Sequence, residues 1–202
     1  MTQPEADAPE RPAFDIVALA SSAGGLTALS EVLSGLPADF PAAVAVVQHL
    51  DPRHRSLMAE ILGRRTQMQV RQAEVGDCLQ PGTVCIAPPD RHMLVNADGS
   101  LSLTQSELVH FVRPSADLLF DSMAAAYRDR AIAVVLTGTG KDGNMGVQAV
   151  KTMGGTVIAQ DEATSEFFGM PQAAILTRSV DFVLPLDEIA PALVALVTGG
   201  KL

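Results

Sequence analysis

Short, almost continuous apolar runs alternate along the chain with stretches in which apolar residues recur at helical spacing. The runs that predict buried strands are 16–20, 42–47, 68–73, 84–87, 131–136, 156–159 and 182–184. The stretches that predict helices are 26–36, 55–62, 115–127, 146–153, 172–176 and 189–197. A strand that is apolar throughout must be covered on both faces, which is typical of parallel sheets with crossover helices. The pattern therefore predicts an α/β fold, doubly wound, with a mostly parallel sheet and helices on both faces.

A second, smaller feature breaks this alternation. Residues 92–96 and 101–104 are short apolar segments separated by Asp98-Gly99, a dipeptide that favours tight hairpin turns. We therefore expect a small antiparallel hairpin near 92–104, beside the main sheet. The helix that follows has Ser115 just before its first apolar residues, which makes Ser115 the expected N-cap.

Composition and length favour one domain with a disordered start. The chain has 202 residues, of which 48% are hydrophobic and 18% are charged, and this excludes a disordered protein. Residues 1–13 are polar, acidic and proline-rich, so we expect a flexible tail there and a single domain over 14–202. No apolar run approaches the roughly 20 residues of a membrane span, and the first 12 residues contain no apolar signal segment. We therefore expect no membrane insertion and a cytoplasmic location.

Charge narrows the choice of partners. The chain has 23 acidic and 14 basic residues, for a net charge of −9, which would repel a phosphate backbone and disfavours a nucleic-acid role. Against this background, Arg53 and Arg55 belong to a short basic segment that either forms a solvated helix face or docks an acidic protein substrate. Cys78 and Cys85 have neither the spacing of metal ligands nor that of a disulfide framework, so we expect reduced thiols.

Three of the predicted strands end in residues that could carry out chemistry. The run 16–20 leads into Ser22, the run 42–47 leads into His49, and the run 131–136 leads into a glycine-rich loop that contains Asp142. In parallel sheets, functional residues gather at the carboxyl edge, close to the point where the strand order reverses. If these strands are neighbours, a serine, a histidine and an aspartate converge on one edge.

Such a group would suit nucleophilic catalysis. A serine hydroxyl is a weak nucleophile and needs a base within hydrogen-bonding reach, and a carboxylate on the other ring nitrogen orients a histidine base. Each residue alone has a commoner structural explanation, because serine before glycines, histidine at a strand end and aspartate before glycine all occur in ordinary turns and caps. Their shared position after apolar strands is the stronger signal.

The loop at 138–143 also supports a competing interpretation. Its sequence matches the G-x-G-x-x-G pattern of dinucleotide-binding proteins, and Asp161 ends the next strand, where a ribose-binding acid would lie. Against this, the charge of Asp142 would oppose a pyrophosphate at the helix N-terminus, and Ser22 and His49 would have no role. A dinucleotide-binding oxidoreductase therefore remains the first alternative. A non-catalytic interaction module of the same fold is the second.

Six segments, taken in order, resemble the catalytic domain of the CheB family of chemotaxis protein-glutamate methylesterases. They are 20–25, 48–50, 86–93, 113–115, 136–143 and 168–171. The resemblance covers almost the whole chain from about residue 16 to residue 197. It implies a serine hydrolase that demethylates glutamyl esters on methyl-accepting chemoreceptors, and that in some members also deamidates receptor glutamines. It implies no metal and no organic cofactor.

The resemblance also implies roles for individual residues. By position in the motifs, Ser22 is the nucleophile, His49 the base and Asp142 the acid that orients it. The oxyanion and the substrate would lie close to Ala23, Thr139 and Gly140. The chain departs from the usual family pattern where Ala20-Ser21 precedes the serine and where Ala23 replaces a frequent threonine.

The resemblance also has an implication for how the activity is regulated. Family members commonly carry an N-terminal receiver domain, and only about 15 residues precede the first predicted strand here. We therefore expect that any control comes from a partner, such as a separate response regulator, or from expression. His92 lies in a family motif and is interpreted as loop architecture. None of the histidines has metal-ligand spacing, so we expect no metal site.

Overall fold

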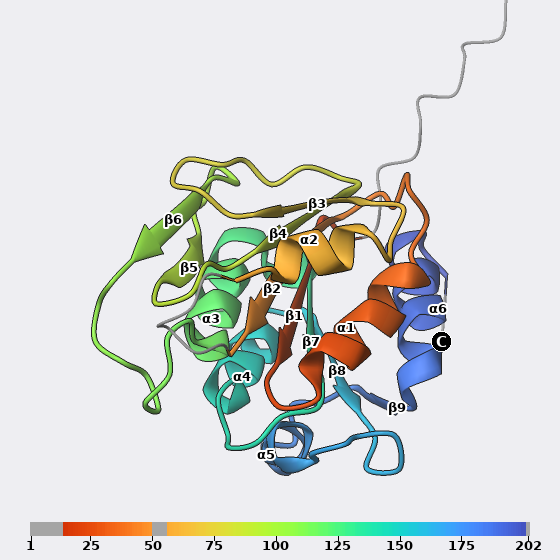
Figure 1. Cartoon of the computed structure of the whole chain (residues 1–202). Helices are drawn as coiled ribbons and strands as arrows, with labels where there is room; N and C mark the ends of the chain where they lie inside the picture. Colours follow the sequence, from red (N-terminus) through yellow and green to blue (C-terminus); the bar gives the residue numbers. More distant parts are fainter. Residues whose placement is uncertain (1–13, 50–55, 201–202) are drawn as a thin grey trace, which may run out of the picture.

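The computed structural model describes residues 14–49 and 56–200, and the predicted tail at 1–13 lies outside them (Figure 1). Within these residues, seven strands form one sheet. In spatial order they are β3 (Gln69–Gln72), β4 (Thr83–Ile86), β2 (Ala43–Gln48), β1 (Ile16–Ser21), β7 (Ala131–Val135), β8 (Thr156–Gln160) and β9 (Phe182–Leu184). Every neighbouring pair is parallel, which confirms the predicted sheet.

The expected hairpin is also present. Strands β5 (His92–Val95) and β6 (Leu101–Thr104) pair antiparallel and form a separate two-stranded sheet. The turn between them places Gly99 at φ 81°, a left-handed conformation that glycine adopts without strain. The predicted Asp-Gly turn is therefore confirmed.

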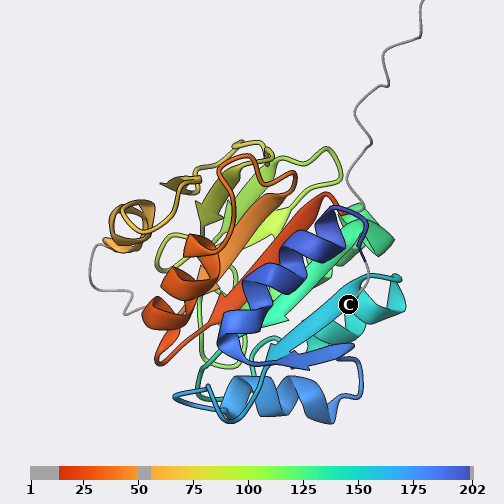
Figure 2. The same ribbon diagram turned by 90° about the vertical axis from the view of Figure 1, so that its right-hand side faces the viewer.

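Helices cover both faces of the main sheet. They are α1 (Gly25–Ser34), α2 (Met58–Gly63), α3 (Ala116–Tyr127), α4 (Asn144–Thr152), α5 (Gly169–Leu176) and α6 (Leu186–Val197), with a short 3-10 turn at Arg128–Arg130. Figure 2 shows α1 and α6 lying on one face, with α3 and α4 behind the sheet. The fold is therefore doubly wound, as predicted.

The apolar character of the central strands follows from this layering. All six residues of β1 are buried. Val17 and Leu19 belong to the core cluster that contains residues of α1 and α6, whereas Ile16 and Ala18 belong to the cluster that contains residues of α3 and α4. Burial of one large aliphatic side chain contributes about 1.5–3 kcal/mol, so a polar residue at any of these positions would be costly.

The strand order explains where a site can form. The chain builds β1 and then β2 on one side of it, and later places β7 on its other side. Ser21 at the end of β1 is paired with Gln48 at the end of β2, and Ala20 is paired with Val135 at the end of β7. The residues that follow β2, β1 and β7 therefore lie side by side at the carboxyl edge, at the topological switch point.

Some helix boundaries differ from the sequence-based prediction. The helix predicted to begin at residue 172 begins at Gly169, and Pro171 is accommodated in its first turn, where a missing N–H costs nothing. The helix predicted from residue 189 begins at Leu186, preceded by Pro185. Glycine and proline in the first turn of α5, and two acidic residues in that of α6, interrupt the apolar periodicity, so these helix starts were missed.

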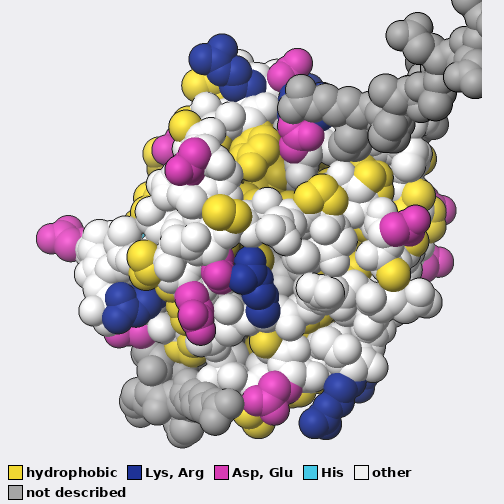
Figure 3. Space-filling view, turned by 90° about the horizontal axis from the view of Figure 1, so that it is seen from above, with side chains coloured by type: hydrophobic (Ala, Val, Ile, Leu, Met, Phe, Trp, Pro, Cys, Tyr) yellow, Lys and Arg dark blue, Asp and Glu magenta, His cyan; other side chains and the backbone are white. Residues whose placement is uncertain are grey.

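The surface of one face is mixed in character, and the longest described helices have 12 residues. On the face that Figure 3 views from above, the acidic and basic side chains of described residues are scattered among apolar and uncharged ones. No helix in the described part of the chain has both the length and the apolarity needed to cross a bilayer.

The packing of α4 against α3 leads to a test of the fold. A Cβ added at Gly146 would lie 2.6 Å from the Cβ of Phe120 and 3.0 Å from the Asp117 carbonyl oxygen. Glycine to alanine normally stabilises a helix by about 0.5–1 kcal/mol. Here we expect Gly146→Ala to lower the free energy of unfolding by about 1–3 kcal/mol, because the two helices must separate.

Urea unfolding followed by circular dichroism measures this change. The matched control is Gln148→Ala, at an exposed position of the same helix, which should change the free energy of unfolding by less than about 0.5 kcal/mol. A Gly146→Ala protein as stable as the control would show that the helices tolerate a methyl group at their contact.

Candidate active site

Ser22 is the first residue after β1. Its backbone N–H donates a hydrogen bond to the Thr137 carbonyl (3.0 Å), so the turn is tied to the loop after β7. The preceding Ser21 is fully buried, and its hydroxyl donates to the side-chain oxygen of Gln48 (2.6 Å). Because Ser21 is committed to this bond while Ser22 is only half-buried, Ser22 is the serine that a substrate can reach.

Gln48 joins the ends of β1 and β2. Its amide nitrogen donates to the carbonyls of Ser22 (2.8 Å) and His49 (3.0 Å). Gly25 faces the same amide, and a Cβ there would overlap the Gln48 side-chain oxygen. Gln48 has no predicted role from the sequence, although a polar residue at the end of an otherwise apolar strand is a usable signal.

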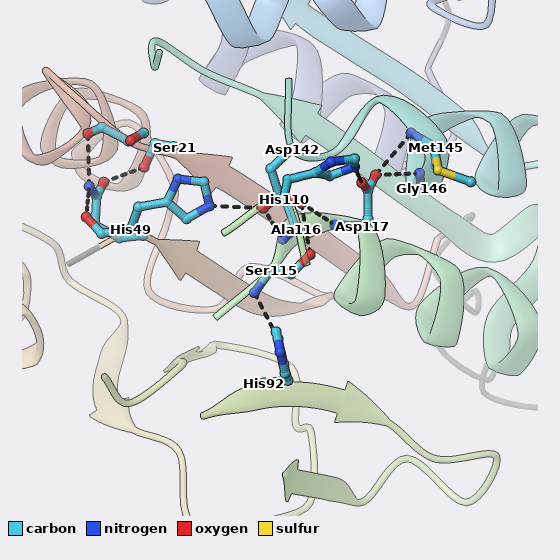
Figure 4. A network of polar contacts seen from close by, with 12 residues as sticks. Ser21, His49, His92, His110, Ser115, Ala116, Asp117, Asp142, Met145 and Gly146 are labelled. Carbon is cyan, nitrogen blue, oxygen red and sulfur yellow. Dashed lines mark hydrogen bonds and ion pairs between the residues drawn. The ribbon is translucent and has the colours of Figure 1, made fainter. Parts of the chain in front are cut away.

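His49 lies between the serine turn and Asp142 (Figure 4). Its backbone N–H donates to the Ser21 carbonyl (3.1 Å), and its ring Nε2 is 2.8 Å from Oδ2 of Asp142. This leaves Nδ1 for a proton from a nucleophile. Within the described residues no hydrogen bond joins His49 to the Ser22 hydroxyl, and such contacts commonly tighten only when substrate binds.

Asp142 is the most constrained member of the group. Its side chain is only 3% exposed, and it accepts hydrogen bonds from His49 and from three donors at the start of α3. These three are the Ser115 hydroxyl (2.7 Å), the Ala116 N–H (2.6 Å) and the Asp117 N–H (3.2 Å). Burial alone would raise the pKa of Asp142, but the bonds from His49, Ala116 and Ser115 outweigh it and hold that pKa below its ordinary value. Asp142 is therefore a carboxylate at neutral pH.

Ser115 is at the N-cap of α3, as predicted, but its side chain does not cap the helix. The hydroxyl donates to Asp142 instead, and the Asp142 carboxylate accepts the N–H groups of the first turn. A carboxylate is the better partner for a helix N-terminus because it carries the charge that the helix dipole favours.

Asp117 caps the start of α4 in the same way that Asp142 caps the start of α3. Its Oδ1 accepts the N–H groups of Met145 (2.9 Å) and Gly146 (2.8 Å). Burial raises the pKa of Asp117, as does the nearby Asp142 charge, while the bond from Gly146 and the proximity of His110 act in the opposite direction. Asp142 precedes α4 and holds the start of α3, and Asp117 lies in α3 and holds the start of α4. Each helix thus fixes the other.

Of the predicted oxyanion residues, Ala23 follows Ser22 directly, and Thr139 and Gly140 lie in the loop after β7. The Ala23 carbonyl accepts a hydrogen bond from the Thr137 hydroxyl (3.1 Å), and Thr139 and Gly140 are exposed in the loop after β7. In the part of the chain that the structure describes, the N–H groups of Ala23, Thr139 and Gly140 donate to no other residue. They are therefore available to a substrate oxygen.

Glycine is required at position 138, just before Thr139. A Cβ on Gly138 would lie 2.9 Å from the Cβ of Ser22 and would overlap the sulfur of Met170. Glycine at position 138 thus allows this loop to approach the serine closely.

The remaining predicted residues do not join this group. Arg53 and Arg55 lie outside the described residues. Among the residues that the structure describes, no three His, Cys, Asp or Glu side chains are grouped so as to hold a metal ion. Cys78 is exposed and Cys85 is buried, and both are free thiols.

Comparison with known proteins decides the family. The model of the CheB methylesterase family matches residues 17–193. The chain belongs to this family. It is 41% identical to the CheB methylesterase catalytic domain of Thermotoga maritima, with a TM-score of 0.88 over 91% of this chain and 99% of that one. The predicted resemblance and the predicted fold are both confirmed.

Curated CheB relatives carry a double name. The protein-glutamate methylesterase/protein-glutamine glutaminase of Moorella thermoacetica is 44% identical over 94% of this chain and 46% of its own length. A Burkholderia lata protein of the same name, numbered 2, is 43% identical over 96% of this chain and 58% of its own length. The chain thus spans about half the length of the curated relatives that it matches.

The dinucleotide-binding interpretation is not supported. Family membership assigns the loop at 138–143 to a CheB domain. The structure adds a physical reason, because the N–H groups of Met145 and Gly146 at the start of α4 already bind the Asp117 carboxylate. A pyrophosphate would need those same groups and would be repelled by that charge.

The raised pKa of Asp117 gives a test of the paired helix caps. A raised pKa means that ionisation of Asp117 weakens the fold as pH rises from the ordinary pKa of the carboxyl group through its raised pKa. Asp117→Asn cannot ionise but keeps an oxygen for Met145 and Gly146. We expect it to match or exceed the wild-type free energy of unfolding at pH 7, with an advantage that shrinks as pH falls towards about 4.

Urea unfolding between pH 4 and pH 7 measures this dependence. The comparison variant is Asp117→Ala, which removes the cap of α4 and should cost about 1–2 kcal/mol at pH 7. If the Asn variant were as unstable as the Ala variant at pH 7, the charge rather than the acceptor would be what α4 requires.

Proposed function

We propose that this chain is a serine esterase that hydrolyses the γ-methyl esters of glutamate side chains on methyl-accepting chemoreceptors and releases methanol. The observation that carries the proposal is the 2.8 Å hydrogen bond from His49 Nε2 to Asp142 at the strand edge where Ser22 begins its turn. The names of the curated relatives support the substrate class.

In the first half of the reaction, the Ser22 hydroxyl attacks the ester carbonyl carbon while His49 accepts its proton at Nδ1. Asp142 holds Nε2 protonated and stabilises the imidazolium that forms. This assignment needs Nδ1 to be the free nitrogen, and the bond between Nε2 and Asp142 supports it.

The negative charge that develops on the carbonyl oxygen needs N–H donors. Ala23, Thr139 and Gly140 supply backbone N–H groups that are not used within the described residues. Donors fixed in advance by a rigid turn stabilise the transition state without reorganising. Ala23 acts through its backbone, so the absence of a threonine hydroxyl does not remove this role.

His49 then returns its proton to the leaving methoxide, which departs as methanol and leaves a glutamyl ester on Ser22. In the second half, His49 takes a proton from water as the water attacks this ester, and passes it to the Ser22 oxygen as the free glutamate leaves. The same steps on a glutamine side chain would release ammonia, so the site also supports deamidation.

Several features of the wider function stay predictions. We expect a cytoplasmic location and control by a separate response regulator. Arg53 and Arg55, which follow His49 closely in sequence, are proposed to dock an acidic receptor surface.

Removal of the nucleophile is the direct test. With receptor membranes carrying radiolabelled methyl esters, we expect Ser22→Ala to reduce methanol release by at least about 10³-fold. The matched control is Ser34→Ala, at an exposed position in α1, which should release methanol at the wild-type rate. An active Ser22→Ala protein would exclude the proposed mechanism, and an inactive wild type would favour the non-catalytic module.

A second variant tests the role of the acid. We expect Asp142→Asn to lower kcat by about 10²–10⁴-fold, because an amide that donates to His49 stabilises the wrong ring tautomer. Steady-state kinetics on the same membranes, with circular dichroism to verify folding, measures the effect. Retention of more than a tenth of wild-type kcat would show that Asp142 serves only to cap α3.

A further inference from the structure

We propose that His92 is a positioning residue that holds Asp142 in place through the first residues of α3. The proposal rests on the function proposed for Ser22, His49 and Asp142. From the sequence, His92 is expected only to shape its loop, and it has no part in the catalytic mechanism proposed above. Figure 4 shows His92 below Ser115, on the far side of Ser115 from Asp142.

The hydrogen bonds of His92 determine its tautomer. Its side chain is completely buried at the start of β5. Nδ1 is 3.1 Å from the Ser115 backbone N–H, which can only donate, so Nδ1 is an acceptor and carries no proton. Nε2 therefore carries the hydrogen and donates to the Glu107 carbonyl (3.0 Å). Both ring nitrogens are committed, so His92 cannot act as a base for Ser115.

The group that His92 holds is the one that holds Asp142. Ser115 is fully buried, and its N–H precedes the helix and has no partner within α3. An unpartnered N–H at this depth would cost about 1–3 kcal/mol. Without His92, the start of α3 would therefore shift to find another acceptor. The donors that would move are the Ser115 hydroxyl and the Ala116 and Asp117 N–H groups, which make three of the hydrogen bonds to Asp142.

His92 is itself held firmly from the other side. Glu107 belongs to the segment before α3, and Arg113 anchors that segment by donating to the Gln105 and Ser106 carbonyls. Arg113 also forms an ion pair with Asp90, just before β5. The β5–β6 hairpin thus supports Asp142 through His92, although the hairpin lies outside the main sheet.

Two substitutions at His92 separate its two hydrogen bonds. In His92→Asn, the side-chain oxygen takes the place of Nδ1 and can still accept the Ser115 N–H. In His92→Gln, the amide reaches the place of Nε2 and can still meet Glu107, but nothing accepts the Ser115 N–H. We expect kcat for methanol release to stay within about threefold of wild type in the Asn variant and to fall about tenfold or more in the Gln variant, with KM unchanged in both.

A second measurement does not depend on the ester substrate. The rate at which a fluorophosphonate labels Ser22 reports how well His49 and Asp142 activate the serine, and it should follow kcat across the variants. The control is Ser102→Ala, which removes a hydroxyl that bonds Asn96 in the same hairpin without touching Ser115, and it should leave both rates unchanged. Thermal unfolding of each variant identifies any that fail to fold.

A double-variant cycle tests the path through Ser115. Ser115→Ala removes one of the bonds to Asp142 that His92 positions, so its effect and that of His92→Gln on labelling should not be additive. Equal rates for the Asn and Gln variants, or additive effects, would overturn the proposal. If the wild type labels at Ser22 but releases no methanol, the proposed substrate is wrong while the labelling rates still decide the role of His92.

Discussion

The site depends on one buried carboxylate. Asp142 has lost almost all contact with solvent, and a charge in that position is tolerated only because four donors replace the water. Three of those donors belong to the start of α3 and the fourth is His49. These hydrogen bonds to Asp142 therefore fix where α3 begins, keep Asp142 ionised and orient His49 towards the serine turn.

This arrangement requires α3 and α4 to meet at their N-terminal ends. Asp117 returns the capping interaction by binding the first N–H groups of α4, the helix that Asp142 precedes. Burial raises the pKa of Asp117, and repulsion from the nearby Asp142 carboxylate raises it further. The absence of a side chain at Gly146 lets the helices approach closely enough for both caps. The geometry of the candidate site and the packing of α3 against α4 therefore depend on the same contacts.

The turn that carries Ser22 is held by strand pairing and by the Gln48 amide. Parallel pairing of β1 with β2 sets Ser22 beside His49, and the Gln48 amide bonds the carbonyls of both. Gly25 and Gly138 leave room for the turn, since a Cβ at either position would strike a neighbouring side chain. Both strands are buried along their whole length, so the turn that follows them extends from tightly packed backbone.

The sequence by itself determined the strands, the layered α/β fold, the hairpin and the positions of Ser22, His49 and Asp142 after three strands. These features are local, since an apolar run or a serine before two glycines is visible within a few residues. Tertiary structure alone decided that Ser115 bonds Asp142 rather than its own helix, that Asp117 caps α4, and that Gln48 and His92 support the site. Each of those bonds joins residues more than 20 positions apart, and whether a polar group finds such a partner depends on which strands and helices become neighbours.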